Sequence, residues 1–391
     1  MSSHHCTRIH PIRCVIVLAA LTFAWPATAQ FTQDDTTGTF RFYGRWDNPT
    51  SNDPGWDAGT FVLDSMGNAT SGSSTDHLGG VTTYTGGSLL LNNLGLLSGS
   101  ISTSGGSDAL SDYKMSLSRE LLVGVDTDPD GYVNLDFIIK TGGSFSTSDL
   151  EGDFHLFTHW DLPSQNDPGW DRVGIAINSL GTVTSTSGID SDGQTLNLTG
   201  LPLTVDADGV ITSVAQTSLE LKMTPDKEMA MGVNVDDDGY VLNLVLIRTG
   251  GVFSNSDLEG RWYVHTFFDD PSGNDPGWER LVVDVSDTGA ITGGSGAASD
   301  GGSDTVTGGS VSIDSSGVVS GSIEFAVSED KVITGFKMNA NHEVMAGVST
   351  DSDGYRSLSV AVVPEPSGGA SLLAAIGTLA ALKRRRRYAS R

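Results

Sequence analysis

Cysteine and basic residues are both scarce in this chain of 391 residues. The two cysteines, Cys6 and Cys14, lie near the amino terminus, and none follows them. If that segment is removed on export, the mature chain has no disulfide, no thiolate metal site and no thiol nucleophile. Between residues 30 and 362 the chain carries 14 basic and 47 acidic residues. So negative a body repels nucleic acid and anionic membranes, whereas it attracts divalent cations.

The sequence also lacks the motifs that mark common catalytic sites. It contains no nucleophile elbow, phosphate-binding loop, HExxH zinc motif or paired-glutamate pattern. Carboxylates are abundant, but no pair stands out as the acid and base of a glycosidase. Three similar copies of one unit, described below, also disfavour a single composite active site. We therefore predict that the protein is not an enzyme.

The first 29 residues have the pattern of a secretory signal peptide. Arg8 and Arg13 precede an apolar run from Cys14 to Trp25, and Ala27-Thr28-Ala29 has the small-x-small pattern of a cleavage site. The apolar run is too short to span a membrane comfortably as an uncleaved anchor. We expect export through the Sec machinery and cleavage by signal peptidase before Gln30.

The last segment, 363–391, has the pattern of a brief stop in export. A Val-Pro-Glu-Pro sequence precedes an apolar stretch at 370–382, and a basic cluster follows it. At about 1.5 Å per residue this predicted helix spans about 20 Å, short of a hydrocarbon core of roughly 30 Å. Basic residues mark the cytoplasmic end of such a helix. The pattern predicts a short transmembrane helix that is inserted transiently.

This tail, on a chain with a signal peptide, resembles the PEP-CTERM sorting signal of Gram-negative bacteria. The resemblance covers only about the last thirty residues. It implies recognition by exosortase, a membrane protease-transpeptidase, followed by removal of the tail and delivery to the cell surface or extracellular matrix. A plain tail anchor is the alternative. The residues that carry the resemblance are Val363, Pro364, Glu365, Pro366, Arg384, Arg385, Arg386 and Arg387.

Between the two ends, one unit of about 110 residues occurs three times. The sequence NDPGW recurs at 52–56, 166–170 and 274–278, SDLEG recurs at 148–152 and 256–260, and DGY recurs at 130–132, 238–240 and 353–355. The predicted domains are 35–148, 149–256 and 257–362. This period is the size of a whole domain rather than of a solenoid turn. Since the links are short, we expect three domains close together with limited hinge motion.

Each copy is predicted to contain about eight short strands and no helix. Alternating runs such as YVNLDFIIK at 132–140 place apolar side chains on one face, and tight turns separate the runs. The fold class is therefore all-β, with three tandem antiparallel meanders. Eight sequential strands suit a barrel of avidin or lipocalin size or a sandwich, and the sequence leaves both open.

The acidic turns before each last strand are candidate calcium sites. Oxygen ligands at alternate positions before a glycine match the first half of a calcium-binding loop, but the glutamate of position 12 is absent. The alternative is an acidic β-turn. Ser349 opens the third turn, and the remaining candidate ligands are Asp126, Asp128, Asp130, Asn234, Asp236, Asp238, Asp351 and Asp353.

Tryptophan and histidine offer two further candidates. Trp56, Trp170 and Trp278 close the NDPGW turns, where exposed rings would stack on sugars and a buried ring would fill the core. His155 and His159 stand four apart on a predicted strand, about 13 Å from one another, which is too far for one metal ion. Since neither sister copy has them, we interpret the body histidines as solvent-exposed or rim residues.

These patterns support three hypotheses. The first is an exported, non-enzymatic surface or matrix protein with a structural or interaction role. The second is a multivalent barrel that binds polysaccharide or a small ligand. The third is a surface protein stabilised by calcium; no other cofactor is expected. The NDPGW motif is interpreted as a turn built three times.

Overall fold

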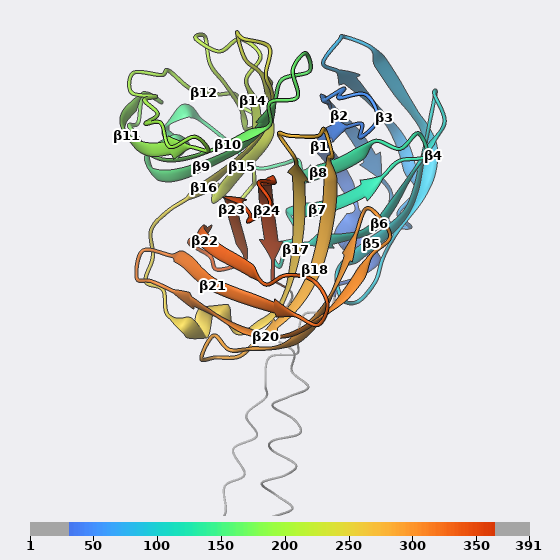
Figure 1. The fold of residues 1–391 in the computed structure, drawn as a ribbon. Coiled ribbons are helices and arrows are strands. Elements are labelled where there is room, and N and C mark those ends of the chain that lie inside the picture. The colour runs from blue at the N-terminus through green and yellow to red at the C-terminus, as the bar shows by residue number, and fades with distance from the viewer. Residues whose placement is uncertain (1–30, 364–391) are drawn as a thin grey trace, which may run out of the picture.

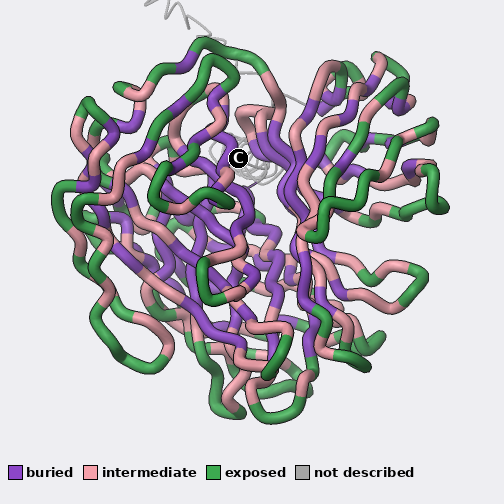
Figure 2. The backbone as a smooth tube through the Cα atoms, turned by 90° about the horizontal axis from the view of Figure 1, so that it is seen from above, coloured by how far each residue is buried: buried purple, intermediate pink, exposed green. Residues whose placement is uncertain are grey.

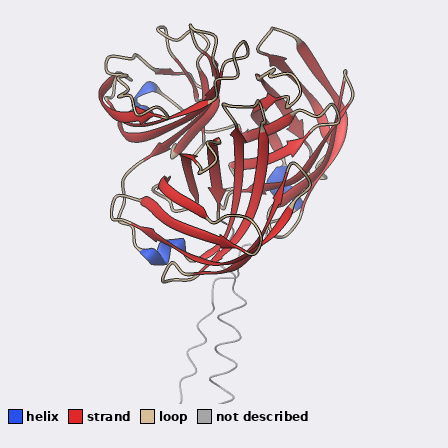
Figure 3. Cartoon of the chain, in the orientation of Figure 1, coloured by secondary structure: helices blue, strands red, loops and turns tan. Residues whose placement is uncertain are grey.

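The computed structural model describes residues 31–363. In these residues 24 strands form three eight-stranded antiparallel sheets, which confirms the predicted all-β fold with three tandem domains (Figures 1 and 3). No helix within 31–363 is long and apolar enough to cross a membrane. The signal peptide, the predicted tail helix and every sorting-motif residue except Val363 lie outside the described residues.

Repeat 1 is a closed barrel in which each strand pairs with the next and the first pairs with the last. The sandwich alternative is therefore wrong for this repeat. Its strands are β1 (Gly38–Asp47), β2 (Gly55–Leu63), β3 (Ala69–Asp76), β4 (Val81–Leu91), β5 (Leu96–Thr103), β6 (Ser107–Met115), β7 (Leu121–Thr127) and β8 (Val133–Lys140).

Repeat 3 closes in the same way, through pairing of its first and last strands. Its strands are β17 (Gly260–Asp269), β18 (Gly277–Val285), β19 (Ile291–Ala298), β20 (Ser303–Ile313), β21 (Val318–Phe325), β22 (Lys331–Met338), β23 (Val344–Thr350) and β24 (Arg356–Val362).

Repeat 2 is an open sheet, because β11 and β12 do not pair. The segment between them holds Leu196, Leu198 and Leu201, which pack against the interior core instead of extending a ladder. Its strands are β9 (Gly152–Asp161), β10 (Gly169–Ile177), β11 (Val183–Asp190), β12 (Thr204–Val205), β13 (Val210–Thr212), β14 (Glu220–Met223), β15 (Met229–Val235) and β16 (Val241–Arg248).

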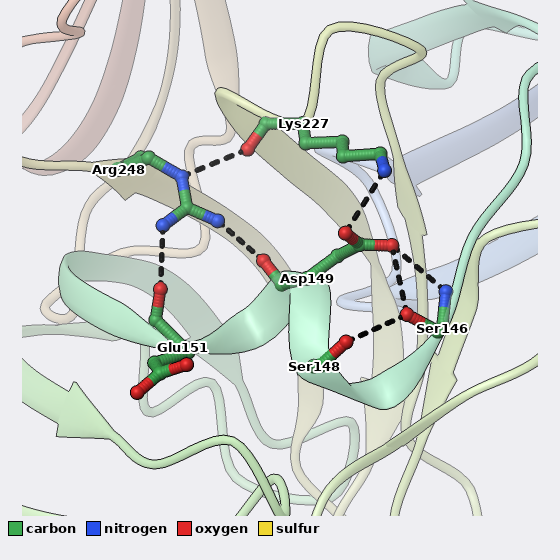
Figure 4. A network of polar contacts seen from close by, with 6 residues as sticks. All are labelled: Ser146, Ser148, Asp149, Glu151, Lys227 and Arg248. Carbon is green, nitrogen blue, oxygen red and sulfur yellow. Dashed lines mark hydrogen bonds and ion pairs between the residues drawn. The ribbon is translucent and has the colours of Figure 1, made fainter.

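A single 3-10 turn precedes each repeat: η1 (Gln33–Thr36), η2 (Thr147–Leu150) and η3 (Asn255–Leu258). The repeated SDLEG sequence forms the second and third of these turns. Figure 4 shows how η2 is fastened: Lys227 Nζ lies 2.9 Å from Asp149 Oδ1, and Arg248 donates to the carbonyl oxygens of Asp149 and Glu151. Asp149 also accepts from the backbone N–H of Ser146 at 2.8 Å. The link between repeats is therefore anchored by charge-assisted hydrogen bonds.

The three repeats pack in a closed ring. The first strands of repeat 1 contact β15 of repeat 2, β9 and β10 contact β23 and β24 of repeat 3, and β17 and β18 contact β7 and β8 of repeat 1. Each repeat thus uses its first strands to contact the last strands of the following repeat. The same contact is made three times around an approximate threefold axis (Figure 1).

One hydrophobic core is shared by all three repeats. Along β8, Leu135, Phe137 and Ile139 point out of their own barrel into this core, whereas Ile138 points into the barrel interior. The corresponding strands of repeats 2 and 3 contribute in the same way. Viewed from above, buried backbone fills the centre of the molecule (Figure 2). The repeats lie close together, as expected, and they share a core because the faces that separate domains would expose are apolar.

Candidate functional sites in the barrels and on the axis

The interior of repeat 3 holds a cavity of about 870 Å³. This size lies within the range of roughly 300–1,000 Å³ that small-molecule sites occupy. Trp262 is 2% exposed and donates its indole N–H to Leu258 O of η3 at 2.9 Å, so the two close the floor of the barrel. Leu281, Val283 and Ile323 line the wall above them. The deep part of the cavity is therefore apolar.

The mouth of this cavity is acidic. Exposed carboxylates line it, and Lys331, paired with Glu279, is its one basic residue. Two hydroxyl pairs stand between mouth and floor: Thr266 with Ser359 at 2.8 Å, and Ser349 with Ser357 at 2.9 Å. The exposed acidic residues at the mouth are Asp275, Asp300, Glu329, Asp330, Asp351 and Asp353. The cavity therefore suits a ligand whose apolar part lies deep in the barrel and whose neutral or cationic group lies at the acidic mouth.

Repeat 1 has a smaller, polar cavity of about 310 Å³. Tyr113 donates its hydroxyl to Asp126 at 3.0 Å and to Asp136. Burial raises the pKa of Asp57 to about 7 and that of Asp126 to about 6, while the pKa of Asp136 rises well above its usual value. The carboxyl groups here are held partly protonated by their surroundings.

The first strands β1, β9 and β17 meet on the threefold axis. Arg45, His159 and Phe267 occupy corresponding positions, two residues before the end of each strand. The Arg45 guanidinium lies 4.6 Å from the Phe267 ring centre, and the His159 and Phe267 rings are 5.3 Å apart. Each repeat therefore contributes a different side chain to one composite layer.

The last residues of these strands, Asp47, Asp161 and Asp269, form the next layer. One oxygen from each carboxylate lies within 4.8 Å of the other two, and all three side chains are fully buried. In each, Oδ1 accepts a hydrogen bond from the following backbone N–H at 2.6–2.8 Å, whereas Oδ2 has no partner in the described residues. Each of the three carboxylates therefore keeps one oxygen without a hydrogen bond to the described residues.

Burial governs the ionisation of this cluster. It raises the pKa of Asp47 to about 7, and the pKa of Asp161 also rises. For Asp269, burial and then the two neighbouring carboxylates raise the pKa to about 8. Arg45 opposes these shifts, but its guanidinium makes no hydrogen bond to the described residues. The cluster is therefore only partly neutralised by its own cation.

The NDPGW turns enclose the carboxylate layer. Asn52 Nδ2 donates to Pro163 O at 3.0 Å, and Asn166 Nδ2 donates to Asp270 O at 3.1 Å. Asn274 Nδ2 completes the ring by donating to Pro49 O at 3.3 Å. All three asparagines have positive φ, between 42° and 48°, a region that asparagine tolerates better than most residues. In each copy the backbone N–H of this asparagine donates to the carbonyl oxygen four residues before it at 3.2 Å, and the glycine of the motif already begins the next strand. The turn built three times therefore precedes NDPGW and ends at its asparagine, and the motif joins the repeats.

The structure does not gather the acidic turns into a ligand set. Asp128 Oδ1 accepts the backbone N–H groups of Asp130 and Tyr132, both at 2.9 Å. Asp236 and Asp351 do the same in their turns, at 2.9–3.0 Å. The first-position residues Asp126, Asn234 and Ser349 bond instead to groups of neighbouring strands: Tyr113 and Asn134, Gln216, and Ser357. Asp130, Asp238 and Asp353 are exposed.

The three motif tryptophans lie between repeats. They pack against the shared core. Trp170 donates its indole N–H to Thr350 Oγ1 of repeat 3 at 2.8 Å, and Trp278 donates to Thr127 Oγ1 of repeat 1 at 2.8 Å. The three tryptophans therefore stabilise the contacts between neighbouring repeats of the ring.

The interpretation of the body histidines as solvent-exposed or rim residues is wrong for two of the five. His159 and His265 are fully buried, and none of His77, His155 and His342 is classed as exposed. Burial lowers the pKa of His265 to about 3 and that of His159 well below its usual value. Of the five, His159 lies on the axis, where its counterparts in the other repeats are Arg45 and Phe267.

Sequence reasoning missed the axial aspartates. A signal for them exists: aspartate stands five residues before the asparagine of every NDPGW, with proline two residues after it. The full motif is therefore DxPxxNDPGW in all three copies. Its first residue is buried on the axis, and its asparagine closes the ring.

No protein-family model matches the chain, and no curated protein matches it in sequence. Among solved structures it is similar to the isotype 1 transferrin-binding protein B of serogroup B Neisseria meningitidis: 13% identity, TM-score 0.27, covering 84% of this chain and 77% of that one. It is also similar to a DUF3598-family protein of unknown function from Nostoc punctiforme, with 9% identity, TM-score 0.19, and 86% and 99% coverage. Such low TM-scores carry no inference about function.

Proposed function

We propose that this is an exported, non-enzymatic binding protein of the cell surface or extracellular matrix, and that its third barrel holds a small amphipathic molecule. The cavity of about 870 Å³ in repeat 3 carries the proposal. Repeat 1 is also a closed barrel, but its cavity is smaller and acidic. Repeat 2 is an open sheet, and leucines of the segment between β11 and β12 pack against its interior core. In this proposal repeat 3 binds the ligand, and repeats 1 and 2 stabilise it through the shared core.

The lining selects the chemistry of the ligand. Its deep wall would cover an alkyl or ring body of the ligand, and burial of such apolar surface supplies most of the binding free energy. The acidic mouth favours a neutral or positively charged head and repels a carboxylate or sulfate. A long-chain amine or amphipathic alcohol therefore fits better than a fatty acid. Sugar stacking on Trp56, Trp170 and Trp278 has less support, since these rings lie between repeats.

A displacement assay tests the proposal. Nile red would report occupancy of the cavity, and dodecylamine and dodecanoate would compete for it. We expect the amine to displace the dye at about one tenth of the dodecanoate concentration, a difference of about 1.4 kcal/mol. Ile323→Trp fills the cavity and should abolish dye binding. Val214→Trp, at an 82% exposed position of repeat 2, is the control. Absence of dye binding, or binding unchanged by Ile323→Trp, contradicts the proposal.

Sorting through the tail is part of the same proposal and needs its own test. It is supported by the Pro-Glu-Pro, apolar and arginine order at 364–387. An epitope tag placed before Val363 would follow the mature chain through export. We expect the surface-delivered form to lack the tail. A surface form that retains the tail would contradict exosortase processing and favour a plain anchor.

A further inference from the structure

Six side-chain oxygens of the three DxPxxNDPGW motifs have no hydrogen-bond partner within 31–363. Three are the Oδ2 atoms of Asp47, Asp161 and Asp269, and three are the Oδ1 atoms of Asn52, Asn166 and Asn274. All six atoms are buried, although the asparagine residues are not fully so. We call these six residues the axial cage. A buried acceptor without a partner is costly, so six together point to a missing positive partner.

The two kinds of residue belong to one structure. Asp47 Oδ1 accepts the backbone N–H of Asp53 at 3.0 Å, so the carboxylate holds the turn that carries Asn52. In repeat 2 the backbone of Asp167, which follows Asn166, bonds to Asp161. Oδ1 of each aspartate and Nδ2 of each asparagine are hydrogen-bonded. One oxygen without a partner remains on each side chain, Oδ2 of the aspartates and Oδ1 of the asparagines.

The charge of the cage is not balanced by the protein. Three carboxylates face one guanidinium, Arg45, which is fully buried. None of its nitrogens lies within ion-pair distance of a carboxylate oxygen in the described residues. If all three acids are ionised, two negative charges remain. One divalent cation would neutralise them.

The geometry suits a hard cation. Three atoms within 4.8 Å of one another all lie within about 2.8 Å of a common point, which is 4.8 Å divided by √3. Calcium–oxygen distances are 2.3–2.6 Å, so a movement of a few tenths of an ångström would complete three bonds. Magnesium requires about 2.1 Å and a stricter octahedron. Carboxylate and amide oxygens are ligands of calcium, while zinc and copper prefer nitrogen and sulfur.

We propose that the axial cage is a single divalent-cation site, selective for calcium, formed only when the three repeats meet. Each repeat contributes one carboxylate and one amide oxygen, so the ion links the repeats at the axis. The site is distinct from the three acidic turns, where the middle aspartates Asp128, Asp236 and Asp351 accept hydrogen bonds from their own backbones. It is also independent of the ligand cavity in repeat 3.

Titration of the chelator-treated full chain with calcium, followed by calorimetry, tests the proposal. We expect one ion per chain and a higher melting temperature with calcium, with magnesium binding at least tenfold more weakly. Asp161→Asn keeps the shape of the side chain and removes a charge, so calcium affinity should fall at least tenfold. Asp236→Asn, in an acidic turn, is the matched control and should leave the affinity unchanged.

The Asp161→Asn variant is expected to fold, because the substitution removes one of three carboxylates that repel each other in the ion-free cage. Its melting temperature without calcium should equal or exceed that of the wild type, while the calcium-induced rise disappears. Asp269→Asn should repeat the result from another repeat. No calcium binding by the folded wild type, three ions per chain, or a loss of affinity in Asp236→Asn with none in Asp161→Asn would overturn the proposal. Water alone in the cage of calcium-soaked crystals would overturn it as well.

Discussion

Asn274 Nδ2 lies 3.3 Å from Pro49 O, although 225 residues separate them in the sequence. This hydrogen bond joins the third repeat to the first and closes the ring. Two equivalent contacts, from Asn52 and Asn166, join the other pairs of repeats. One short motif therefore makes every junction at this end of the axis.

Replacement of this asparagine should weaken the ring closure. Asn274→Ala removes the donor and places alanine at φ 48°, so we expect a loss of about 2 kcal/mol in the free energy of unfolding. Asn274→Gly tolerates that φ and should lose less. Ser272→Ala, in the same turn but exposed, should change stability by less than about 0.5 kcal/mol. Denaturant titration gives all three values, and equal losses for Ala and Gly would contradict the role of backbone strain.

A missing hydrogen bond in the ring can be restored. Trp170 and Trp278 donate to Thr350 and Thr127, whereas the buried indole N–H of Trp56 has no partner in the described residues. The residue of repeat 2 that corresponds to these threonines is Val235, at the end of β15. Val235→Thr should therefore stabilise the protein by about 1 kcal/mol.

The double variant Val235→Thr with Trp56→Phe serves as the control. Because phenylalanine has no N–H, the gain from threonine should disappear in that background. Chemical denaturation measures the coupling. A threonine that stabilises both backgrounds equally would show that the hydrogen bond is not its cause.

Unfolding should be cooperative across the three repeats. Repeat 3 alone would expose six large apolar side chains of the shared core, each of which contributes about 1.5–3 kcal/mol when buried. Their sum is comparable to the stability of a typical domain. We therefore expect one calorimetric transition for the full chain and no stable monomer from residues 257–363. Three separate transitions would contradict the shared core. The side chains are Phe267, Val344, Val348, Leu358, Val360 and Val362.

The axial carboxylates should make stability depend on pH. In the folded state the pKa is about 7 for Asp47 and about 8 for Asp269, whereas in the unfolded chain both titrate near 4. Between these values the folded state binds more protons, so the free energy of unfolding falls as pH rises from about 4 to 8. Asp161 and Arg45 also face the cluster, and His159 stays neutral because burial lowers its pKa.

Asp269→Asn isolates this contribution from that of the barrel carboxyls. In chelator, the wild type should lose stability more steeply than the variant between pH 5 and 8, by up to about 1.4 kcal/mol per pH unit for one proton. Added calcium should oppose the loss most strongly at high pH, since the ion displaces protons. Parallel curves for the two proteins would show that Asp269 ionises normally.

Much of the fold could be predicted because strands and turns are local. Alternation along 133–139 depends on neighbouring residues. The turn before each NDPGW lies a few residues earlier than Asp-Pro-Gly, and it ends at the asparagine of the motif. Alternation could not show which face of β8 points into its own barrel. Leu135 and Ile138 look equally buried from sequence, yet they belong to different cores.

The candidate sites were less predictable, since they depend on distances between repeats and on the space inside barrels. The acidic turns were predicted as calcium sites because their carboxylates are close in sequence. The axial cage joins Asp47, Asp161 and Asp269, which are more than a hundred residues apart. The cavity of repeat 3 depends on how its side chains fill a closed barrel, and repeat 2 shows that leucines from one irregular segment can fill the interior instead.

The sequence by itself determined the number of repeats and their all-β character, because these follow from local periodicity and backbone preference. Only the tertiary structure decided that the repeats close into a ring. Closure depends on apolar faces that bury each other across the whole chain, and it converts Arg45, His159 and Phe267 from unmatched residues into one buried layer. The axial carboxylates exist as a cluster only because that packing brings three strand ends together.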